Sequence, residues 1–378
     1  MSKVNISLVG GQPMPVYVGI YATNCDHVIL VHSEGEKGSQ PEAEGIKSGC
    51  GIPATLYALP TADYNDILVK AEELLSDLSD DEVWVNISGG TKLWTVAFTM
   101  LSFGRKNIKL FYIDQNNVFY DITQKNSRNL FLNLDTKTIL RYNNQPLPTY
   151  TSYSDYTRED HEVLKKVMRL RTYAFRDFNA LTIPLKKTDW SKDLASLAMP
   201  QLTLPSDSSI FYDKALKAIT ITLKKRGSLM IEQLRSEHVE NIVFHAGWME
   251  FFVAKTLSKW LLSKEIWLNV KFPYRDGKAK NEIDVIVNVG GKLLFVECKT
   301  QIADNTDIDK FRTAVRNYSG MGGKALFVTY SPMRPEAVQK CKDSGILTFS
   351  FQKDSYLMRP ESELLNMLDK EITNINKK

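Results

Sequence analysis

One run, Asn281–Thr300, restricts the fold of this 378-residue chain more than any other part of the sequence. It reads NEIDVIVNVGGKLLFVECKT, with Gly290 and Gly291 between two runs rich in β-branched residues. A glycine pair in this setting predicts a two-residue turn between antiparallel strands. With the two glycines as the turn, the pairing register places Asp284 directly opposite Glu297.

The same register sorts the side chains of both strands onto two faces. Because side chains alternate along a strand, Glu282 and Lys299 project from the same face as Asp284 and Glu297. The other face is predicted to be the apolar one. It carries Val285, Val287, Val296 and Cys298.

Asp284 and Glu297 predict a site for a divalent cation. Facing carboxylates repel each other unless a cation lies between them. Carboxylate oxygens, with the remaining positions left to water and phosphate, suit Mg²⁺ or Mn²⁺. Lys299 can orient or deprotonate an attacking water and offset the charge of a phosphate. This set of residues predicts metal-assisted hydrolysis of a phosphodiester bond.

A further catalytic candidate is Glu250, in the predicted helix Gly247–Leu262. Helical spacing puts Glu250 on a stripe with Ala254, Leu257 and Leu261. A carboxylate on an otherwise apolar stripe needs a partner. We therefore expect Glu250 to point toward the cation or toward a water bound to it.

The first part of the chain alternates between strand and helix patterns. Apolar residues of Asp63–Leu78 recur at helical spacing, and the mostly apolar Lys92–Phe103 follows a later strand. Units of this kind predict a mainly parallel, Rossmann-like α/β sheet with right-handed crossovers. The predicted strands are Val4–Val9, Val28–His32, Thr55–Leu59, Val83–Ile87 and Ile108–Ile113.

Glycine pairs follow two of these strands. The first strand leads into Gly10, Gly11, Gln12 and Pro13, and the fourth into Ser88, Gly89, Gly90, Thr91 and Lys92. In a doubly wound sheet such loops meet at the carboxyl ends of the strands. Thr91 is the expected N-cap of the next helix, whose free backbone N–H groups suit a phosphate. The spacing matches neither GxxxxGK[ST] nor GxGxxG, so an anion-binding crevice is predicted without P-loop nucleotide hydrolysis.

The remaining segments predict a middle region and a second α/β domain. Val118–Ile122 and Leu130–Leu134 have the pattern of a strand hairpin, and Tyr142–Ser154 that of a linker. His161–Phe178 predicts a basic amphipathic helix, whereas Lys186–Asp207 predicts irregular structure. We expect a sensing domain at residues 1–145, a linker and middle helical region at 146–239, and a catalytic domain at 240–378. After the catalytic hairpin we expect helices at Asp307–Tyr318 and Pro335–Asp343 and strands at Ala325–Thr329 and Ile346–Phe351.

The two candidate sites resemble those of known families. Asp284, Glu297 and Lys299, with Glu250 on a preceding helix, resemble the PD-(D/E)xK motif of restriction-endonuclease-like nucleases, although Ile283 stands where that motif has proline. The expected element order also resembles the α-β-β-β-α-β core of that fold. The two glycine loops resemble those of CARF domains, and the whole chain is similar to the CARF–nuclease effectors of type III CRISPR systems.

This resemblance implies an antiviral defence effector that binds a cyclic oligoadenylate, usually cyclic tetra-adenylate, in a homodimeric CARF domain. It also implies an endonuclease that uses Mn²⁺ or Mg²⁺ and cuts DNA or RNA, often single-stranded. The implied ligand-binding residues are Gly11, Gln12, Pro13, Ser88, Gly89, Gly90, Thr91 and Lys92. The implied catalytic residues are Glu250, Asp284, Glu297 and Lys299, with Asp284 and Glu297 as metal ligands. Two alternatives remain open: an ungated nuclease whose N-terminal domain only dimerises, and a ligand-responsive nucleic-acid-binding regulator with an inactive nuclease fold.

Composition narrows the class of protein further. Hydrophobic residues make up 43% of the chain and charged residues 24%, as in ordinary globular proteins. No apolar run approaches the roughly 18–20 residues of a membrane span, and the first residues lack the pattern of a signal peptide. The net charge of +4 is too small to indicate a nucleic-acid partner by itself. Because Cys25, Cys50, Cys298 and Cys341 form no CxxC pair, we expect a cytoplasmic protein without a zinc site or a disulfide framework.

Overall fold

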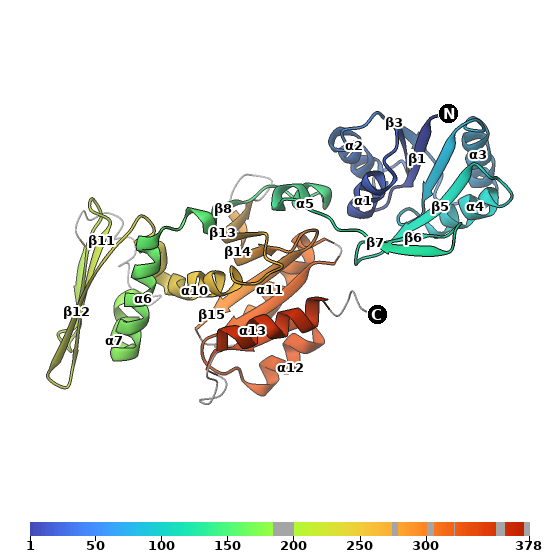
Figure 1. The fold of residues 1–378 in the computed structure, drawn as a ribbon. Helices are drawn as coiled ribbons and strands as arrows, with labels where there is room; N and C mark the ends of the chain where they lie inside the picture. The colour runs from blue at the N-terminus through green and yellow to red at the C-terminus, as the bar shows by residue number, and fades with distance from the viewer. Residues whose placement is uncertain (184–199, 274–278, 301–305, 321, 353–359, 374–378) are drawn as a thin grey trace.

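Three β-sheets follow one another along the chain in the residues that the structure describes (Figure 1). The structure is a computed structural model, and it describes all residues except 184–199, 274–278, 301–305, 321, 353–359 and 374–378. Within the described residues, none of the helices has both the length and the apolar character needed to cross a membrane.

The N-terminal domain is the predicted Rossmann-like sheet. Its strand order is β3-β2-β1-β4-β5-β6-β7, and the first five of these run parallel. Helices α3 and α4 pack on one face of the sheet and α1 and α2 on the other. The strands are β1 (Lys3–Leu8), β2 (His27–His32), β3 (Ala54–Ala58), β4 (Glu82–Asn86), β5 (Ile108–Ile113), β6 (Val118–Asp121) and β7 (Asn126–Asn129). The helices are α1 (Met14–Thr23), α2 (Gln40–Gly49), α3 (Tyr64–Ser76) and α4 (Lys92–Ser102).

The hairpin at the edge of this sheet differs from the prediction in its second strand. The strand expected at Leu130–Leu134 lies instead at β7, which is exposed along its whole length. The chain reverses early because Lys125 adopts the left-handed conformation, with φ of +54°. The apolar side chains of Leu130, Leu132 and Leu134 instead pack against the small core of Met14, Val18, Phe111, Ile113 and Phe119.

The segment expected to be a linker is partly regular. Helix α5 (Thr136–Tyr142) ends where the linker was expected to begin, and β8 (Thr149–Ser152) pairs with a strand of the C-terminal sheet. A strand of four residues rich in threonine and serine carries too short an alternation to be recognised in sequence.

The middle segment was expected to be helical, but the structure shows both helices and a β-sheet there. The helix predicted at His161–Phe178 is broken at Ala174 into α6 (Arg158–Tyr173) and α7 (Phe175–Thr182). An antiparallel sheet follows, in the order β12-β11-β10-β9. Its strands are β9 (Gln201–Thr203), β10 (Ser209–Asp213), β11 (Ala218–Lys225) and β12 (Ser228–Arg235). Most of the irregular segment expected at Lys186–Asp207 lies outside the described residues.

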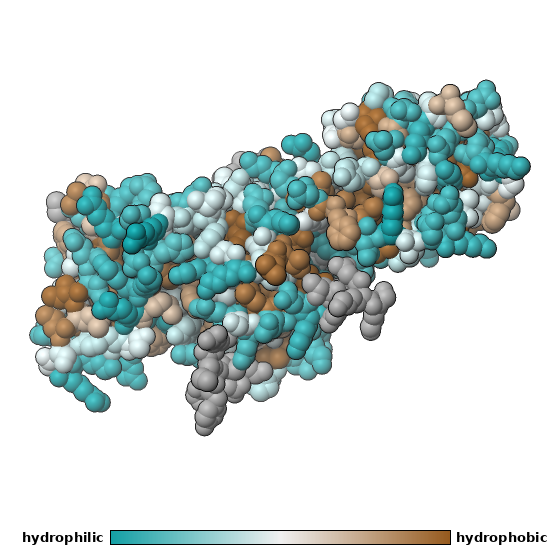
Figure 2. Space-filling model, in the orientation of Figure 1, coloured by the Kyte–Doolittle hydropathy of each residue, from teal (hydrophilic) through white to brown (hydrophobic). Residues whose placement is uncertain are grey.

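This middle sheet buries one face only. Its inner face packs on α6 through Ile219, Ile221 and Leu234. On the other face Leu229 and Ile231 of β12 are exposed, and Figure 2 shows apolar side chains at this end of the molecule.

The C-terminal domain has a mixed sheet in the order β17-β16-β15-β14-β13-β8. The helices are α9 (Val239–Val243), α10 (Gly247–Leu257), α11 (Thr306–Tyr318), α12 (Pro335–Asp343) and α13 (Pro360–Leu368). The further strands are β13 (Glu265–Pro273), β14 (Ala279–Asn288), β15 (Leu293–Lys299), β16 (Lys324–Thr329) and β17 (Ile346–Ser350). From α10 to β16 the elements follow the expected order α-β-β-β-α-β.

The predicted hairpin register is correct. Val285 faces Val296 and Asn288 faces Leu293, and the N–H of Val289 donates to the carbonyl of Lys292 across the turn. Gly290 has a φ of +97°, which a residue with a Cβ rarely adopts.

Both faces of the catalytic hairpin are buried, although only one was expected to be apolar. The predicted apolar face, with Val285, Val287, Val296 and Cys298, packs against α10 and α13. On the opposite face Ile286, Leu293 and Phe295 pack against α11 and α12. The carboxylates of the hairpin therefore lie near the end of a covered sheet and not on an open strand face.

Candidate functional site

The two glycine loops of the N-terminal domain meet as predicted. A Cβ at Gly10 would lie 3.0 Å from the backbone nitrogen of Gly90. A Cβ at Gly89 would lie 2.4 Å from the carbonyl oxygen of Leu8, closer than real Cβ atoms come. The two loops therefore approach this closely only because glycine occupies both positions.

A cavity of about 280 Å³ opens beside these loops. We call it the sensor crevice. It is lined by Val9, Gly10, Gly11, Ser33, Lys37, Gly38, Ser39, Glu42, Thr61, Gly90, Thr91 and Trp94. These residues follow the carboxyl ends of β1, β2, β3 and β4, where doubly wound folds bind their ligands.

Sequence reasoning missed the loop after β2. There the hydroxyls of Ser33 and Ser39 lie 3.4 Å apart, and the backbone N–H of Ser39 donates to the Ser33 hydroxyl at 3.0 Å. Lys37 from this loop lines the crevice, where a cation would favour an anionic ligand. The signal was present in Gly35 and Gly38, which lie three and six residues beyond the end of the second predicted strand.

The predicted ligand-binding residues divide into two groups. Gly11, Gly90 and Thr91 line the crevice. The rest of the set does not: Gln12 and Lys92 are exposed beside it, Pro13 is buried at the start of α1, and Gly89 packs against Leu8.

Two hydroxyls of this set have structural partners. Thr91 caps α4 by accepting a hydrogen bond from the N–H of Trp94 at 3.2 Å, as the sequence predicts. The Ser88 hydroxyl donates to Asn86 at 2.6 Å and accepts from the N–H of Ile113 at 2.7 Å. Ser88 therefore ties the crevice loop to the end of β5.

The C-terminal candidates form one cluster. Nζ of Lys299 lies 2.5 Å from Oε1 of Glu297 and 3.9 Å from Oδ2 of Asp284. The backbone N–H of Cys298 donates to Oδ2 of Asp284 at 2.7 Å. The carboxylates are only 14% (Asp284) and 13% (Glu297) exposed. The facing pair and the lysine that the hairpin register predicts are thus brought together.

The sheet changes at the position of Asp284. In β14, Ile283 packs in the same core as Ile286, whereas Val285 packs in the other, so the alternation of faces breaks between them. In β13 the same break occurs at Asn269, which has a φ of +52°. Because both strands switch faces here, the Asp284 side chain leaves the regular sheet and reaches the cluster.

Electrostatics in the cluster are dominated by burial and by repulsion between acids. Burial, together with the neighbouring Asp284, raises the pKa of Glu297, and burial also raises the pKa of Asp284. Burial would lower the pKa of Lys299, but the two carboxylates outweigh it and raise that pKa. Lys299 is therefore an ammonium here, suited to donate to a water or phosphate and not to accept a proton.

Glu250 joins the same electrostatic cluster from α10. Burial raises its pKa well above the ordinary value, with Asp284 as the next largest cause. Ala254 and Leu257 are buried below it as expected, but α10 ends at Leu257 and Leu261 is exposed beyond the helix. The predicted stripe is therefore shorter than expected.

The residues of this cluster fit a divalent cation held by two protein ligands. Among the described residues, no group of three or more histidine, cysteine, aspartate or glutamate side chains is arranged to hold a metal ion. Mg²⁺ in phosphate chemistry usually has one or two carboxylates and leaves its other positions to water and substrate oxygens. Asp284 and Glu297 supply this donor set, and burial raises the pKa of both carboxyl groups, so a bound cation would stabilise their charged forms.

Sequence reasoning missed one cation beside the cluster. Arg171 of α6 is only 4% exposed, and its guanidinium carbon lies 3.8 Å from the ring centre of Trp248 and 4.5 Å from that of Tyr330. Trp248 precedes Glu250 by two residues, and the N–H of Tyr330 donates to the carbonyl of Lys299 at 3.0 Å. The stacked arginine thus fastens α6 to the segments on both sides of the cluster.

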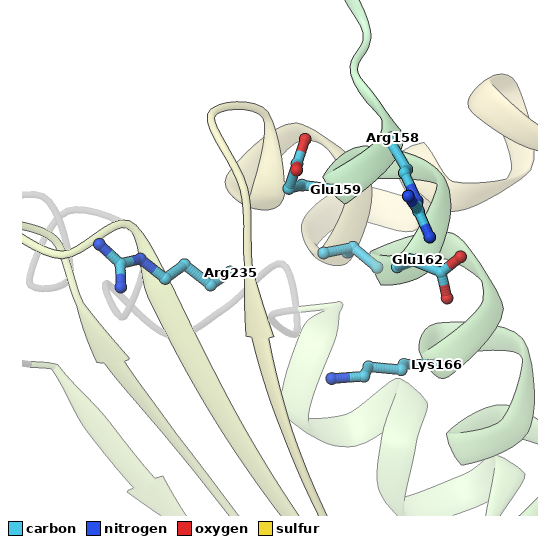
Figure 3. A pocket seen from close by; sticks show the side chains of 6 residues that line it. Arg158, Glu159, Glu162, Lys166 and Arg235 are labelled. Carbon is cyan, nitrogen blue, oxygen red and sulfur yellow. The ribbon is translucent and has the colours of Figure 1, made fainter.

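A second cavity, of about 210 Å³, lies between α6 and β12 (Figure 3). Its lining mixes charges of both signs: Arg158, Glu159, Glu162, Val163, Lys166 and Arg235. Nζ of Lys166 donates to the carbonyl of Gln233 at 2.8 Å. These contacts hold the middle sheet on α6, and the paired acids leave no clear surplus of charge for a ligand.

The two ends of the chain match two family models. Residues 4–138 match the Card1 CARF domain, and residues 239–355 match the Card1-like endonuclease domain. Fold and site therefore define a class of protein in which a CARF sensor domain is joined to an endonuclease domain. Within that class, the two models that match are those of the Card1 CARF domain and of the Card1-like endonuclease domain, and together they cover two thirds of the chain. The predicted fold class and family are confirmed.

Solved structures share this fold over nearly the whole chain. Can2 from Sulfobacillus thermosulfidooxidans, in complex with cyclic tetra-adenylate, is 17% identical with a TM-score of 0.65, over 97% of this chain and 98% of that chain. VC1899 from Vibrio cholerae is 14% identical with a TM-score of 0.71, over 97% of each chain. A type III CRISPR defence DNA nuclease activated by cyclic oligoadenylate is 14% identical with a TM-score of 0.55, over 96% of this chain and 52% of that chain. No curated protein matches this chain.

Proposed function

We propose that this protein is a metal-dependent endonuclease of type III CRISPR defence, activated when a cyclic oligoadenylate binds its CARF domain. The observation that carries the proposal is the intact cluster of Asp284, Glu297 and Lys299 in a chain whose other end is a CARF domain. A nuclease fold that had lost activity would have no need to keep two buried acids and a lysine together.

Cyclic tetra-adenylate is the proposed activator. Can2, which shares the fold, was solved in complex with that molecule. The sensor crevice offers backbone N–H groups of glycine loops, the N-terminus of α4 and the Lys37 side chain, all of which favour phosphates.

A homodimer is proposed as the form that binds this ligand. A cyclic oligonucleotide is much larger than a crevice of about 280 Å³, so two crevices must meet to hold it. Beside the crevice, α4 exposes an apolar stripe at helical spacing. The stripe consists of Leu93, Val96, Met100 and Phe103, which are 39%, 48%, 57% and 79% exposed. Two copies of α4 packed together would cover these side chains and join the crevices about a two-fold axis.

The residues of the catalytic cluster have distinct roles in this proposal. Asp284 and Glu297 would hold Mg²⁺ or Mn²⁺, which supplies Lewis-acid polarisation of the phosphate and a lowered pKa for water. Lys299, an ammonium, donates to the water or to the phosphate and offsets its charge. Glu250, whose pKa is raised by burial and by Asp284, would orient a second water. The proposed substrate is DNA, RNA or both.

The test is a cleavage assay on single- and double-stranded DNA and RNA with Mn²⁺ or Mg²⁺, with and without cyclic oligoadenylates of four and six residues. We expect cleavage that needs both the metal and the cyclic tetra-adenylate. Glu297→Gln should reduce it by at least about 10²-fold while leaving ligand affinity unchanged. The matched control is Lys310→Ala, which removes an exposed charge of α11.

Two results would contradict the proposal in different ways. Equal cleavage with and without ligand would identify an ungated nuclease. Ligand binding without cleavage of any substrate would identify a binding regulator with an inactive nuclease fold.

A further inference from the structure

The turn of the catalytic hairpin is fastened to the sensor domain. Nζ of Lys292, at the start of the β15 side, lies 3.0 Å from Oδ1 of Asn116 in the turn between β5 and β6. The backbone N–H of Leu134 donates to the carbonyl of Gly290 at 3.3 Å. The side-chain amide of Asn288 donates to the carbonyl of Leu134 at 2.7 Å.

This contact is closely packed. A Cβ at Gly291 would lie 3.1 Å from the amide nitrogen of Asn117 and 3.1 Å from the Cβ of Leu132. Asn288 is buried, and its amide oxygen accepts from the N–H of Gly290 at 2.7 Å, which ties the turn to its own strand. The tip of the hairpin therefore follows the sensor domain when that domain shifts.

The sensor side of the contact begins beside the crevice. Ser88, in the loop that leads to the crevice, accepts a hydrogen bond from the N–H of Ile113, the last residue of β5. The next residue, Asp114, accepts from the N–H of Asn116 at 2.7 Å and so fixes the turn. Hydrogen bonds and short stretches of chain thus run without a break from the crevice to Lys292.

The other end of the same hairpin carries the acids. Along β15 the chain rises roughly 3.3 Å per residue, so Lys292 and Glu297 lie about 17 Å apart along one stiff ribbon. Asp284 lies where β13 and β14 both switch faces, and its carboxylate accepts a hydrogen bond from the N–H of Cys298 in β15. A small rotation at the tip therefore changes the spacing of Asp284 and Glu297 and with it their fit to a cation.

We propose that Asn116 and Lys292 are positioning residues through which an occupied sensor crevice sets the geometry of Asp284 and Glu297. The inference rests on the proposed function and adds the physical route of its regulation. Neither residue lines the sensor crevice as described, and neither belongs to the catalytic cluster. Through their contact, a movement of the sensor domain at the hairpin turn would be passed along the catalytic hairpin to the acids at its other end.

The experiment uses the full-length protein and three variants of the contact. Lys292→Met keeps the packing of the side chain and removes its ammonium, and Asn116→Leu removes the acceptor. Asn116→Asp keeps an acceptor and serves as the conservative variant. Lys310→Ala, an exposed lysine of α11, is again the control. Cleavage is measured with and without cyclic tetra-adenylate, and the affinity for this ligand is measured by isothermal titration calorimetry.

For Lys292→Met and Asn116→Leu we expect the activation ratio to fall at least about tenfold. Basal cleavage and ligand affinity should stay within about twofold of the wild type, and Asn116→Asp should retain activation. Because coupling between two sites is reciprocal, bound substrate should tighten cyclic tetra-adenylate binding in Glu297→Gln protein. Lys292→Met added to that protein should remove this effect.

Full activation of both Lys292→Met and Asn116→Leu would overturn the inference while leaving the proposed function intact. A proportional loss of basal and activated cleavage would overturn it too, because it would indicate a structural role only. A wild-type protein that no cyclic oligoadenylate activates would instead refute the proposed function, and this inference with it.

Discussion

Among the single residues of the catalytic cluster, Lys299 supplies the positive charge that offsets the two carboxylates. It is the cation within 4 Å of both Asp284 and Glu297. Replacing it by methionine should reduce cleavage by at least about 10²-fold, because a donor to the developing phosphate charge is lost. In metal-free protein the same change should lower the melting temperature, since the two acids then repel each other without a counter-charge.

Cleavage rates and thermal unfolding check this prediction, the latter with and without Mn²⁺. Added Mn²⁺ should recover more of the melting temperature in Lys299→Met than in the wild type. Cleavage within threefold of the wild type would show that Lys299 has no catalytic part.

The surroundings of Asp160 in α6 predict how the stability of the protein depends on pH. It is fully buried and accepts hydrogen bonds from the N–H of Thr157 at 2.8 Å and from the ring of His238 at 3.1 Å. Burial alone would raise the pKa of Asp160, but these hydrogen bonds outweigh it and lower the pKa. Because the folded-state pKa is depressed, the stabilisation is present above the unfolded value of about 3.9 and is lost as the pH falls below it.

Asp160→Asn should therefore cost about 1–3 kcal/mol of unfolding free energy at pH 7 and progressively less as the pH falls below about 3.9. Urea unfolding of the variant and the wild type at several pH values measures this difference. The exposed Glu363→Gln serves as the control. A cost that does not change with pH would show that the carboxylate charge contributes nothing.

Helix α4 is the element on which the proposed dimer depends. Met100→Asp combined with Phe103→Asp places two charges on its exposed apolar stripe, far from the helix core of Trp94 and Phe98. We expect the protein to become monomeric and to bind cyclic tetra-adenylate at least tenfold more weakly. Sedimentation velocity and calorimetry measure the two effects, and Tyr21→Ser, an exposed aromatic of α1, is the control. A double variant that stays dimeric would place the interface elsewhere.

Elements with strong local patterns could be predicted from the sequence, and elements held by distant partners could not. The hairpin register followed from two glycines, because a turn fixes every pair beyond it. In contrast, β8 and β7 lack an apolar alternation, and each forms by pairing with a neighbouring strand, β13 for β8 and β6 for β7. That helices cover the face of the catalytic acids was not predicted, because covering helices leave no trace in the strand itself.

The candidate site was predictable to a similar extent. Asp284, Glu297 and Lys299 belong to one ribbon, so their proximity followed from local rules. Arg171 comes from a helix more than a hundred residues before Lys299 in sequence, and its aromatic partners come from two other segments. The helical spacing of α6 places Arg171 on the buried stripe with Leu164 and Val167, but it does not reveal the aromatic partners of this arginine.

The proposed metal can be tested on the whole molecule, because a chelator should affect the catalytic site and leave the sensor crevice unchanged. Treatment with a chelator should abolish cleavage, and added Mn²⁺ or Mg²⁺ should restore it. Cyclic tetra-adenylate binding should survive the chelator, because the groups proposed to hold the ligand, backbone N–H groups and Lys37, need no metal. Calorimetry and cleavage assays on the same sample check both parts. Cleavage that continues in excess chelator would rule out the metal.

The position of β8 in the C-terminal sheet determines where the chain can be cut to give a soluble fragment of the endonuclease domain. β8 borders β13 at the rim of the C-terminal sheet, although the whole middle segment separates the two in sequence. A fragment cut at residue 239 would contain every residue that the endonuclease family model matches, yet it would bare a row of unpaired N–H and C=O groups along β13. Such a fragment should self-associate in solution, whereas one that starts ahead of Thr149 should stay dispersed.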